Sequence, residues 1–389
     1  MKKIALVTCY FQHNYGSQLQ ALATQMVCDK LGWPNETIRI DGLKSEINKA
    51  KYCYFLSRCL DIYTIKDKMA TVRKYYAKKT NYYYAKSLQV RDHIFQKFAE
   101  ERFYLSQRYN SKKELGKKAN DYSTFLVGSD QLWLPSNISA DYYTLNFVPN
   151  GTGIRKIAYA TSFGVSKLPT KQAKMAKLFL PHFDSIMVRE ESGKKLVKEL
   201  IGLDVPIVCD PTMLFKAEEW GKILPQRRRF NEPYILCYFL GNNPEQRIWA
   251  KKLAQITNNR IVQLPNLDEY IKSDEGFADY PLYDVDPLEF VSLIRDAQYV
   301  LTDSFHCTSF SILFQKIFFC FRRYPYDNKV STNGRLYSLL NSIGLSERIL
   351  SAKELVEDCL QLQINYARIN QHVQQMREFS IKSLKNSVN

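Results

Sequence analysis

His306 stands in the segment of this chain that is richest in potential chemistry. Residues 300–310 read V-L-T-D-S-F-H-C-T-S-F, so an apolar strand is followed by Asp303, Ser304 and His306 and then by a helix. A helix N-terminus lowers the proton affinity of a nearby imidazole, whereas an anionic ligand raises it. We therefore expect His306 to exchange a proton near neutral pH as a general acid or base. A purely structural histidine is the alternative.

A second candidate, Arg189, follows the apolar run 185–188. A guanidinium at the end of a buried strand is costly unless it meets a carboxylate or a phosphate, which it can grip with two N–H groups. Arg189 is thus predicted to bind an anion, with Glu190 or Glu191 as alternative, structural partners. Asp210, at the end of another expected strand, is most simply explained as a cap.

Two further loops carry candidate binding groups. The loop 13–17, H-N-Y-G-S, joins a strand to a helix N-terminus, where free N–H groups favour an anion and Gly16 permits close approach. We expect Asn14, Gly16 and Ser17 to contribute there; an ordinary turn with Ser17 as cap is the alternative. The loop 127–133, V-G-S-D-Q-L-W, presents Asp130, Gln131 and Trp133 at a strand end, where open α/β sheets bind ligands. An Asx turn covered by the indole is the alternative.

The elements that position these groups alternate along the chain. Strands are expected at 3–9, 36–40, 124–127, 156–160, 185–188 and 206–209, with helices at 17–31 and 170–180. A second series has strands at 234–240, 260–264, 299–302 and 317–321 and helices at 244–256, 286–296 and from about 308. Alternation of this kind predicts an α/β fold with parallel sheets covered by helices.

The domain boundaries follow from breaks in this pattern. We expect a Rossmann-like domain over 1–224, a linker at 225–233 that contains Arg227-Arg228-Arg229 and two prolines, and a second Rossmann-like domain over 234–351. Residues 352–389 are expected to form a C-terminal helix, roughly 352–380, that packs back on the first domain.

Residues 44–118 form a basic insertion in the first domain. They hold 19 of the 55 Lys and Arg but only 7 of the 39 Asp and Glu, and they are rich in tyrosine. Helical spacing is plausible throughout, and two interpretations are equally good: a helix that lies on an anionic membrane surface, or a solvated hairpin whose tyrosines pack on the first domain. Nucleic-acid binding is disfavoured, because no recognised motif accompanies the charge.

Composition excludes several other classes of protein. A chain of 389 residues with 45% hydrophobic residues has enough material for two full cores and is not disordered. Its longest apolar runs fall far short of the ~20 residues that a spanning helix needs. Nine cysteines without a C-x-x-C pair indicate neither a disulfide framework nor a zinc site, so we expect a reducing cytoplasm and no metal.

Taken together, six motifs resemble the polysaccharide pyruvyl transferase family. They are N-Y-G-S-Q-L-Q-A at 14–21, V-G-S-D-Q-L-W at 127–133, S-F-G at 162–164, V-R-E-E-S-G at 188–193, D-P-T at 210–212 and T-D-S-F-H at 302–306. The resemblance implies two Rossmann-like domains in a GT-B-like arrangement. It also implies transfer of the pyruvyl group of phosphoenolpyruvate, as a ketal, onto a sugar of a cell-surface polysaccharide precursor that could be lipid-linked, with no cofactor.

The resemblance places the family's histidine at His306 and its arginine at Arg189. His306 is then the expected general acid, and Asp130 the group that orients or deprotonates the acceptor hydroxyl. Arg189, Ser304, Asn14, Gly16 and Ser17 are expected to bind the donor, and Gln131, Trp133 and Asp303 the acceptor.

The chain departs from the family pattern on both sides of the histidine, and Cys307 follows it where relatives commonly have Gly. Some relatives have Arg-Leu before the histidine, where this chain has Ser304-Phe305, so either another basic residue substitutes or the donor is held differently. Two alternatives stay open: a GT-B glycosyltransferase that uses a nucleotide sugar, and a polysaccharide assembly protein without catalysis. The basic insertion is expected near the cytoplasmic face of the membrane.

Overall fold

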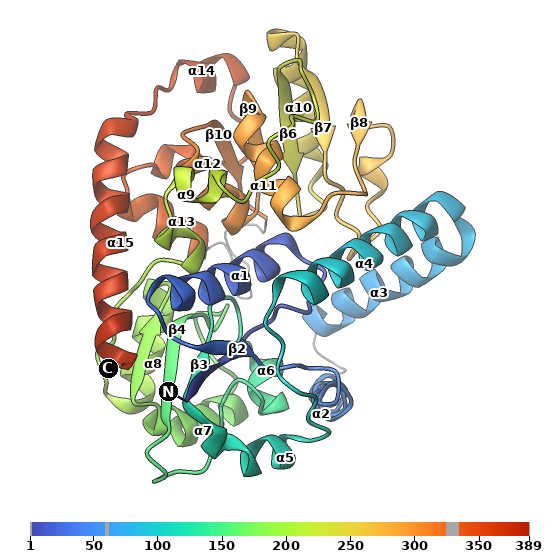
Figure 1. Cartoon of the computed structure of the whole chain (residues 1–389). Helices are drawn as coiled ribbons and strands as arrows, with labels where there is room; N and C mark the ends of the chain where they lie inside the picture. Colours follow the sequence, from blue (N-terminus) through green and yellow to red (C-terminus); the bar gives the residue numbers. More distant parts are fainter. Residues whose placement is uncertain (1, 59–61, 324–333, 389) are drawn as a thin grey trace.

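The computed structural model describes residues 2–58, 62–323 and 334–388. Residues 59–61 of the expected insertion and 324–333 of the expected second domain therefore lie outside the described residues. Two all-parallel sheets flanked by helices make up the protein (Figure 1), which confirms the fold class predicted from the alternating pattern.

The first sheet has the strand order β2-β1-β3-β4-β5. Its strands are β1 (Lys3–Val7), β2 (Asn35–Thr37), β3 (Tyr122–Val127), β4 (Arg155–Thr161) and β5 (Ser185–Val188). The associated helices are α1 (Tyr15–Lys30), α5 (Lys112–Lys117), α6 (Pro135–Ala140), α7 (Thr170–Phe179), α8 (Glu191–Ile201) and α9 (Ala217–Gly221). The strands are almost entirely buried, as expected for a parallel sheet with both faces covered.

The strand expected at 206–209 is wrong. Only Ile207 pairs with Val188, as an isolated bridge. Pro206 has no N–H for a ladder, and Asp210 already begins the 3-10 turn η3 (Pro211–Leu214) by accepting a hydrogen bond from Thr212 N.

The second sheet has the strand order β11-β10-β9-β6-β7-β8. Its strands are β6 (Tyr234–Tyr238), β7 (Arg260–Gln263), β8 (Tyr280–Pro281), β9 (Tyr299–Thr302), β10 (Ile317–Phe321) and β11 (Ile349–Leu350). The helices around it are α10 (Pro244–Thr257), α11 (Pro287–Asp296), α12 (Phe305–Leu313) and α13 (Gly334–Ser342). Because α12 begins at Phe305, earlier than expected, His306 lies inside its first turn.

The C-terminal segment forms two helices, α14 (Val356–Gln361) and α15 (Tyr366–Val388), so the single helix expected over 352–380 is wrong. The break arises where the Asn365 side chain accepts a hydrogen bond from Arg368 N and starts a new helix. Helix α15 runs along one side of the molecule to the first sheet (Figure 1), where Ser387 O accepts from Arg155 Nη1 at 2.8 Å.

The basic insertion forms α2 (Lys44–Leu56), α3 (Ile62–Thr80) and α4 (Tyr82–Arg102). Helices α3 and α4 form a hairpin that projects from the first half of the molecule (Figure 1). The hairpin contacts the second half: Tyr84 Oη donates to Leu267 O at 3.2 Å, and Arg91 Nη2 lies 3.1 Å from Asp268 Oδ1. The alternative in which the tyrosines of the insertion pack on the first domain is therefore wrong for Tyr84.

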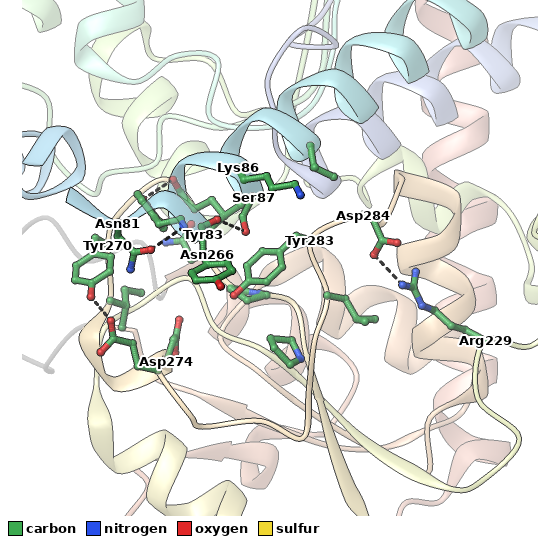
Figure 2. A pocket seen from close by; sticks show the side chains of 18 residues that line it. Asn81, Tyr83, Lys86, Ser87, Arg229, Asn266, Tyr270, Asp274, Tyr283 and Asp284 are labelled. Atoms are coloured by element: carbon green, nitrogen blue, oxygen red, sulfur yellow. Dashed lines mark hydrogen bonds and ion pairs between the residues drawn. The ribbon is translucent and has the colours of Figure 1, made fainter. Parts of the chain in front are cut away.

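Helix α4 and the segment between β7 and β8 enclose a cavity of about 490 Å³, called the hairpin pocket below (Figure 2). Among the helices of the described ranges, none is long and apolar enough to cross a bilayer.

Candidate active site

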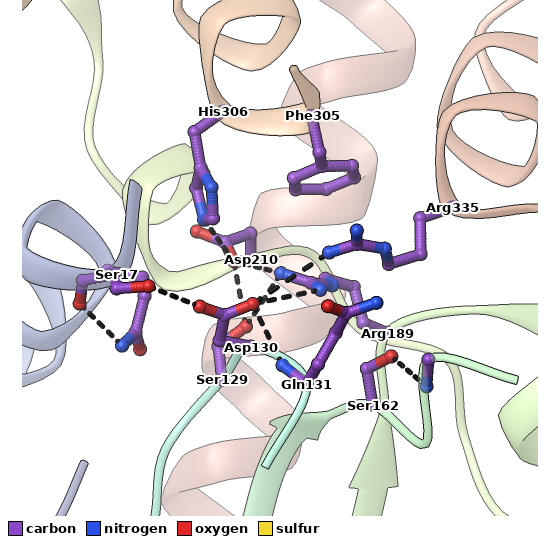
Figure 3. Close-up of polar contacts among 12 residues, drawn as sticks. Ser17, Ser129, Asp130, Gln131, Ser162, Arg189, Asp210, Phe305, His306 and Arg335 are labelled. Atoms are coloured by element: carbon purple, nitrogen blue, oxygen red, sulfur yellow. Dashed lines mark hydrogen bonds and ion pairs between the residues drawn. The ribbon is translucent and has the colours of Figure 1, made fainter. Parts of the chain in front are cut away.

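A cluster of charged side chains forms where strand ends of both sheets meet the N-termini of α1 and α12 (Figure 3). The first half supplies Asp130 after β3 and Arg189 after β5, and the second half supplies His306. Asp130 has a φ of +83°, a left-handed conformation that is rare for a residue with a side chain. Strained backbone of this kind often accompanies a functional site.

Asp210 is the centre of the cluster. Its Oδ2 accepts from Ser129 Oγ at 2.7 Å and from Arg189 Nη1 at 3.0 Å, and it lies 3.4 Å from His306 Nε2. Burial alone would raise the pKa of Asp210, but His306 and then Arg189 outweigh it and hold the pKa far below the ordinary value of 3.8. Through this one oxygen, the imidazole and the guanidinium from opposite halves of the molecule converge.

Asp130 lies on the other side of Arg189. Its Oδ2 accepts from Ser17 Oγ at 2.7 Å, and its Oδ1 accepts from its neighbour Gln131 N at 2.8 Å. Burial opposes ionisation of this carboxyl, yet the charges of Arg189, His306 and Arg335 hold its pKa below the ordinary value. Asp130 is therefore a carboxylate at neutral pH, and a carboxylate can orient a hydroxyl or accept its proton.

Arg335, from α13, brings a second guanidinium to the cluster. Arg335 Nη1 and Arg189 Nη2 each lie 3.8 Å from the same oxygen, Asp130 Oδ1. Within the described residues, Arg189 Nε and Nη2 and Arg335 Nε have no hydrogen-bond partner. Burial, and then the nearby charge of Arg189, lower the pKa of Arg335 to about 10. Arg189 Nε also lies 3.7 Å from Glu190 Oε2, so both guanidinium groups have carboxylates nearby but keep N–H groups without hydrogen bonds. Such N–H groups can bind an anion.

Gly16 lies directly against His306. A Cβ atom added at Gly16 would stand 2.0 Å from His306 Nδ1 and 2.5 Å from its Cγ, so only a glycine fits beside the imidazole. The sequence predicted a close approach at Gly16, and the group that comes close to it is His306, a side chain of the other half of the molecule. Gly16 sets how near the first turn of α1 comes to His306.

Two of the predicted residues, Asn14 and Ser304, cap helices, and a third, Gln131, lies at the cluster itself (Figure 3). Asn14 caps α1 by accepting from Ser17 N, and Ser304 caps α12 by accepting from Cys307 N. These caps fix the two helix starts that carry Ser17 and His306. Gln131 lies at the cluster (Figure 3), and its Nε2 is buried without a partner in the described part of the chain.

Two of the predicted acceptor ligands need correction. Trp133 is fully buried, donates its Nε1–H to Tyr143 O, and packs among Phe163, Phe179 and Phe183, so it belongs to the core. Both oxygens of Asp303 are taken by backbone groups, since they accept from Leu240 N and Gly241 N at 2.7 and 2.8 Å. The Asp303 carboxylate shapes the turn between β6 and α10 and is not free to bind a sugar.

Asp210 and Arg335 were not predicted as site residues. Asp210 does cap a turn through Oδ1, but the use of its second oxygen depends on packing between elements distant in sequence. The absence of an arginine just before His306 indicated that another basic residue could take its place, but it did not indicate which one. Arg335 supplies a guanidinium to the same cluster from 29 positions further along the chain.

A cavity of about 590 Å³ opens onto the cluster from the side of α13 and α15. Arg189, Asp210 and Phe305 are among the residues that line it. The centroid of the Phe305 ring lies 4.5 Å from the guanidinium carbon of Arg189. This contact fixes the plane of the guanidinium group. A small anion in this cavity could therefore reach Arg189.

The depressed pKa of Asp210 predicts how stability depends on pH. A carboxyl whose pKa falls on folding stabilises the protein above its unfolded-state pKa, and this contribution is lost as the pH falls toward the folded-state value. Asp210→Asn is therefore expected to cost about 3–5 kcal/mol at pH 6–7, the cost of breaking a buried ion pair. Urea unfolding should show the difference shrinking below about pH 4.

The exposed Asp204→Asn is the matched control for this measurement, since Asp204 lies outside the cluster. A difference between wild type and Asp210→Asn that stays constant down to pH 2 would contradict the prediction.

Similar solved structures share the path of the chain at low identity. A Listeria monocytogenes protein, provisionally assigned as a UDP-N-acetylglucosamine 2-epimerase, has a TM-score of 0.50 and 9% identity, over 96% of this chain and 91% of that one. The UDP-GlcNAc 2-epimerase of Methanocaldococcus jannaschii, solved with UDP-GlcNAc and UDP, has a TM-score of 0.45 and 12% identity, over 97% of this chain and 99% of that one. MurG of Acinetobacter baumannii has a TM-score of 0.41 and 8% identity, over 97% of this chain and 95% of that one. These similarities concern the fold alone.

The two parallel sheets, with a charged cluster at strand ends of both, define a GT-B-like protein of two Rossmann-like domains. A sequence model of the polysaccharide pyruvyl transferase family matches residues 14–323, and the chain belongs to that family. The family predicted from the six motifs is thereby confirmed. No curated protein sequence matches the chain significantly.

Proposed function

We propose that this protein transfers the pyruvyl group of phosphoenolpyruvate onto two hydroxyls of a sugar, as a ketal, in a cell-surface polysaccharide precursor. The observation that carries the proposal is the pair of guanidinium groups, Arg189 and Arg335, beside His306 and Asp130. Phosphoenolpyruvate has a phosphate and a carboxylate on three carbons, and two guanidinium groups that keep N–H groups without hydrogen bonds, beside a general acid, suit this molecule. No cofactor is required.

The chemical steps use the groups in the cluster. His306 gives a proton to the methylene carbon of the donor, which leaves a cationic centre at the central carbon. One sugar hydroxyl adds there and loses its proton to Asp130. Phosphate then departs with the electrons of its C–O bond and takes up the proton held by Asp130. A second hydroxyl adds, and its proton goes to His306, which closes the ketal and restores both side chains. Phosphoenolpyruvate and a diol thus become a ketal and phosphate.

Arg335 also bears on the alternative of an assembly protein without catalysis. That alternative was favoured by the missing arginine before His306. The cation has a candidate substitute in Arg335, whose Nη1 lies 3.8 Å from Asp130 Oδ1. The proposal assigns it to the donor's anionic groups.

Thermal unfolding with candidate donors tests the proposal. We expect phosphoenolpyruvate to raise the Tm, because a ligand at 100 times its Kd stabilises the native state by about 2.7 kcal/mol. Arg335→Met is expected to weaken donor binding about 10–100-fold, since a charge-assisted hydrogen bond contributes about 1.5–3 kcal/mol. Arg368→Met, on the exposed face of α15, is the matched control. Stabilisation by UDP in place of phosphoenolpyruvate would instead favour the glycosyltransferase alternative.

We also propose that the α3–α4 hairpin contacts an anionic membrane surface. Four tyrosines near its tip, Tyr75, Tyr76, Tyr82 and Tyr83, are 61–81% exposed. Lys78 and Lys79 lie among them. Exposed aromatic rings beside lysines suit the headgroup region of a bilayer. A lipid-linked acceptor would meet the protein on this side.

Vesicle sedimentation tests the membrane proposal. Each lysine near an anionic surface contributes about 1 kcal/mol, so reversing both charges with Lys78→Glu and Lys79→Glu is expected to reduce binding to phosphatidylglycerol vesicles at least tenfold. The same charge change at Lys251 and Lys252, on the exposed side of α10, is the control. Equal binding by the two double variants would remove the hairpin from consideration as the docking surface.

A further inference from the structure

The hairpin pocket is a second cavity whose size suits a binding site. Its volume of about 490 Å³ lies within the ~300–1,000 Å³ range of small-molecule sites. One wall is α4 and the other is the segment between β7 and β8 (Figure 2). We propose that this pocket binds a sugar unit of the acceptor glycan other than the unit that receives the pyruvyl group. This inference rests on the proposed function.

The lining suits a sugar ring. Tyr83, Tyr84, Tyr270 and Tyr283 provide aromatic surface from both walls, and Figure 2 shows Tyr283 reaching into the space between them. A sugar ring offers an apolar C–H face to such surfaces and a rim of hydroxyls to polar groups. Amides and carboxylates that accept or donate hydrogen bonds surround the rings, among them Asn81, Asn266 and Asp274.

The charge of the pocket argues against a nucleotide. Three carboxylates and two cations line it, and several of these charges are already paired. Arg229 lies 2.7 Å from Asp284 and 2.8 Å from Glu289, and Asp274 lies 2.9 Å from Arg247. With Arg229 engaged, the lining offers a diphosphate little available positive charge, whereas an uncharged sugar needs none.

A separate small cavity, of about 20 Å³, borders both the hairpin pocket and the loop that begins α1. This cavity is lined by His13, Asn14 and Tyr15, and it shares Asn266 and Tyr283 with the hairpin pocket. The next residue, Gly16, touches His306. None of the charged residues of the active-site cluster lines the hairpin pocket. A glycan held there would be anchored by one unit while a neighbouring unit extends toward the cluster.

The experiment measures binding of the labelled full-length protein to an array of bacterial surface oligosaccharides with two or more sugar units. Wild type is expected to bind at least one of them, and Tyr83→Ala, which removes an exposed ring, to bind it at least tenfold more weakly. Ser87→Trp, which fills the pocket in place of opening it, should have the same effect. Tyr52→Ala, an exposed tyrosine of α2 outside the pocket, should bind as wild type.

Phosphate release from phosphoenolpyruvate, measured with the bound oligosaccharide, separates this inference from the proposed function. Pocket-dependent binding without phosphate release would overturn the pyruvyl transfer but support a glycan site. Phosphate release with an unchanged KM for the oligosaccharide in both pocket variants would overturn the glycan site alone. Absence of binding to every oligosaccharide on the array would also overturn it.

Discussion

His306→Ala is expected to abolish phosphate release from phosphoenolpyruvate, with a loss of at least ~10²–10⁴-fold, the usual contribution of a well-placed general acid. The imidazole is the titratable group in the cluster that can carry a proton to the donor while Asp130 and Asp210 remain ionised, as their depressed pKa values require. Initial rates of phosphate release, measured with and without a sugar acceptor, check the prediction.

A folding check and a control variant distinguish the loss of the imidazole from a loss of the fold. Because His306 is buried, its removal leaves a cavity, so the circular dichroism spectrum and Tm of the variant must be measured together with its rate. His182→Ala, at an exposed position of the 3-10 turn η2 (Leu180–His182), is the matched control and should retain full activity. A folded His306→Ala protein that still forms the ketal at the wild-type rate would remove His306 from the mechanism.

The convergence of His306 and Arg189 could be predicted because both follow buried parallel strands. In such sheets the carboxyl ends of the strands share an edge, and two domains that face each other bring two edges together. The period and length of the apolar runs were enough to locate those edges. This arrangement of parallel strands predicts which residues lie at the carboxyl edges of the sheets. Asp130, Arg189 and His306 are such residues, and they lie in one cluster.

The same rule does not say what each side chain meets there. Asp303 and Asp130 both follow strands, yet backbone N–H groups take both oxygens of Asp303, whereas Asp130 faces two arginines. Arg335 was beyond prediction because α13 reaches the cluster only through the packing of the whole second domain. Likewise, no local pattern in 44–118 indicates that Tyr84 donates to Leu267, 183 residues away.

Gly16→Ala is the second substitution from which we expect a very large effect, and the reason is steric. The added methyl would overlap the His306 ring, with Nδ1 at 2.0 Å, so the ring must leave its place 3.4 Å from Asp210 Oδ2. A displaced imidazole cannot give its proton to a donor held by Arg189, and even a small misplacement of reacting groups costs about 10²-fold. We expect activity to fall nearly as far as in His306→Ala, together with a lower Tm.

A double-mutant cycle separates this clash from a general effect on α1. The three atoms nearest to the added Cβ all belong to His306. In the His306→Ala background, Gly16→Ala should therefore lose most of its cost in unfolding free energy, because alanine removes the ring that the methyl meets. Gly221→Ala, where a Cβ would meet nothing within 4 Å, is the control. If the costs of the two substitutions in unfolding free energy are additive, Gly16 acts through its own helix. The contact between Gly16 and His306 would then not contribute to catalysis.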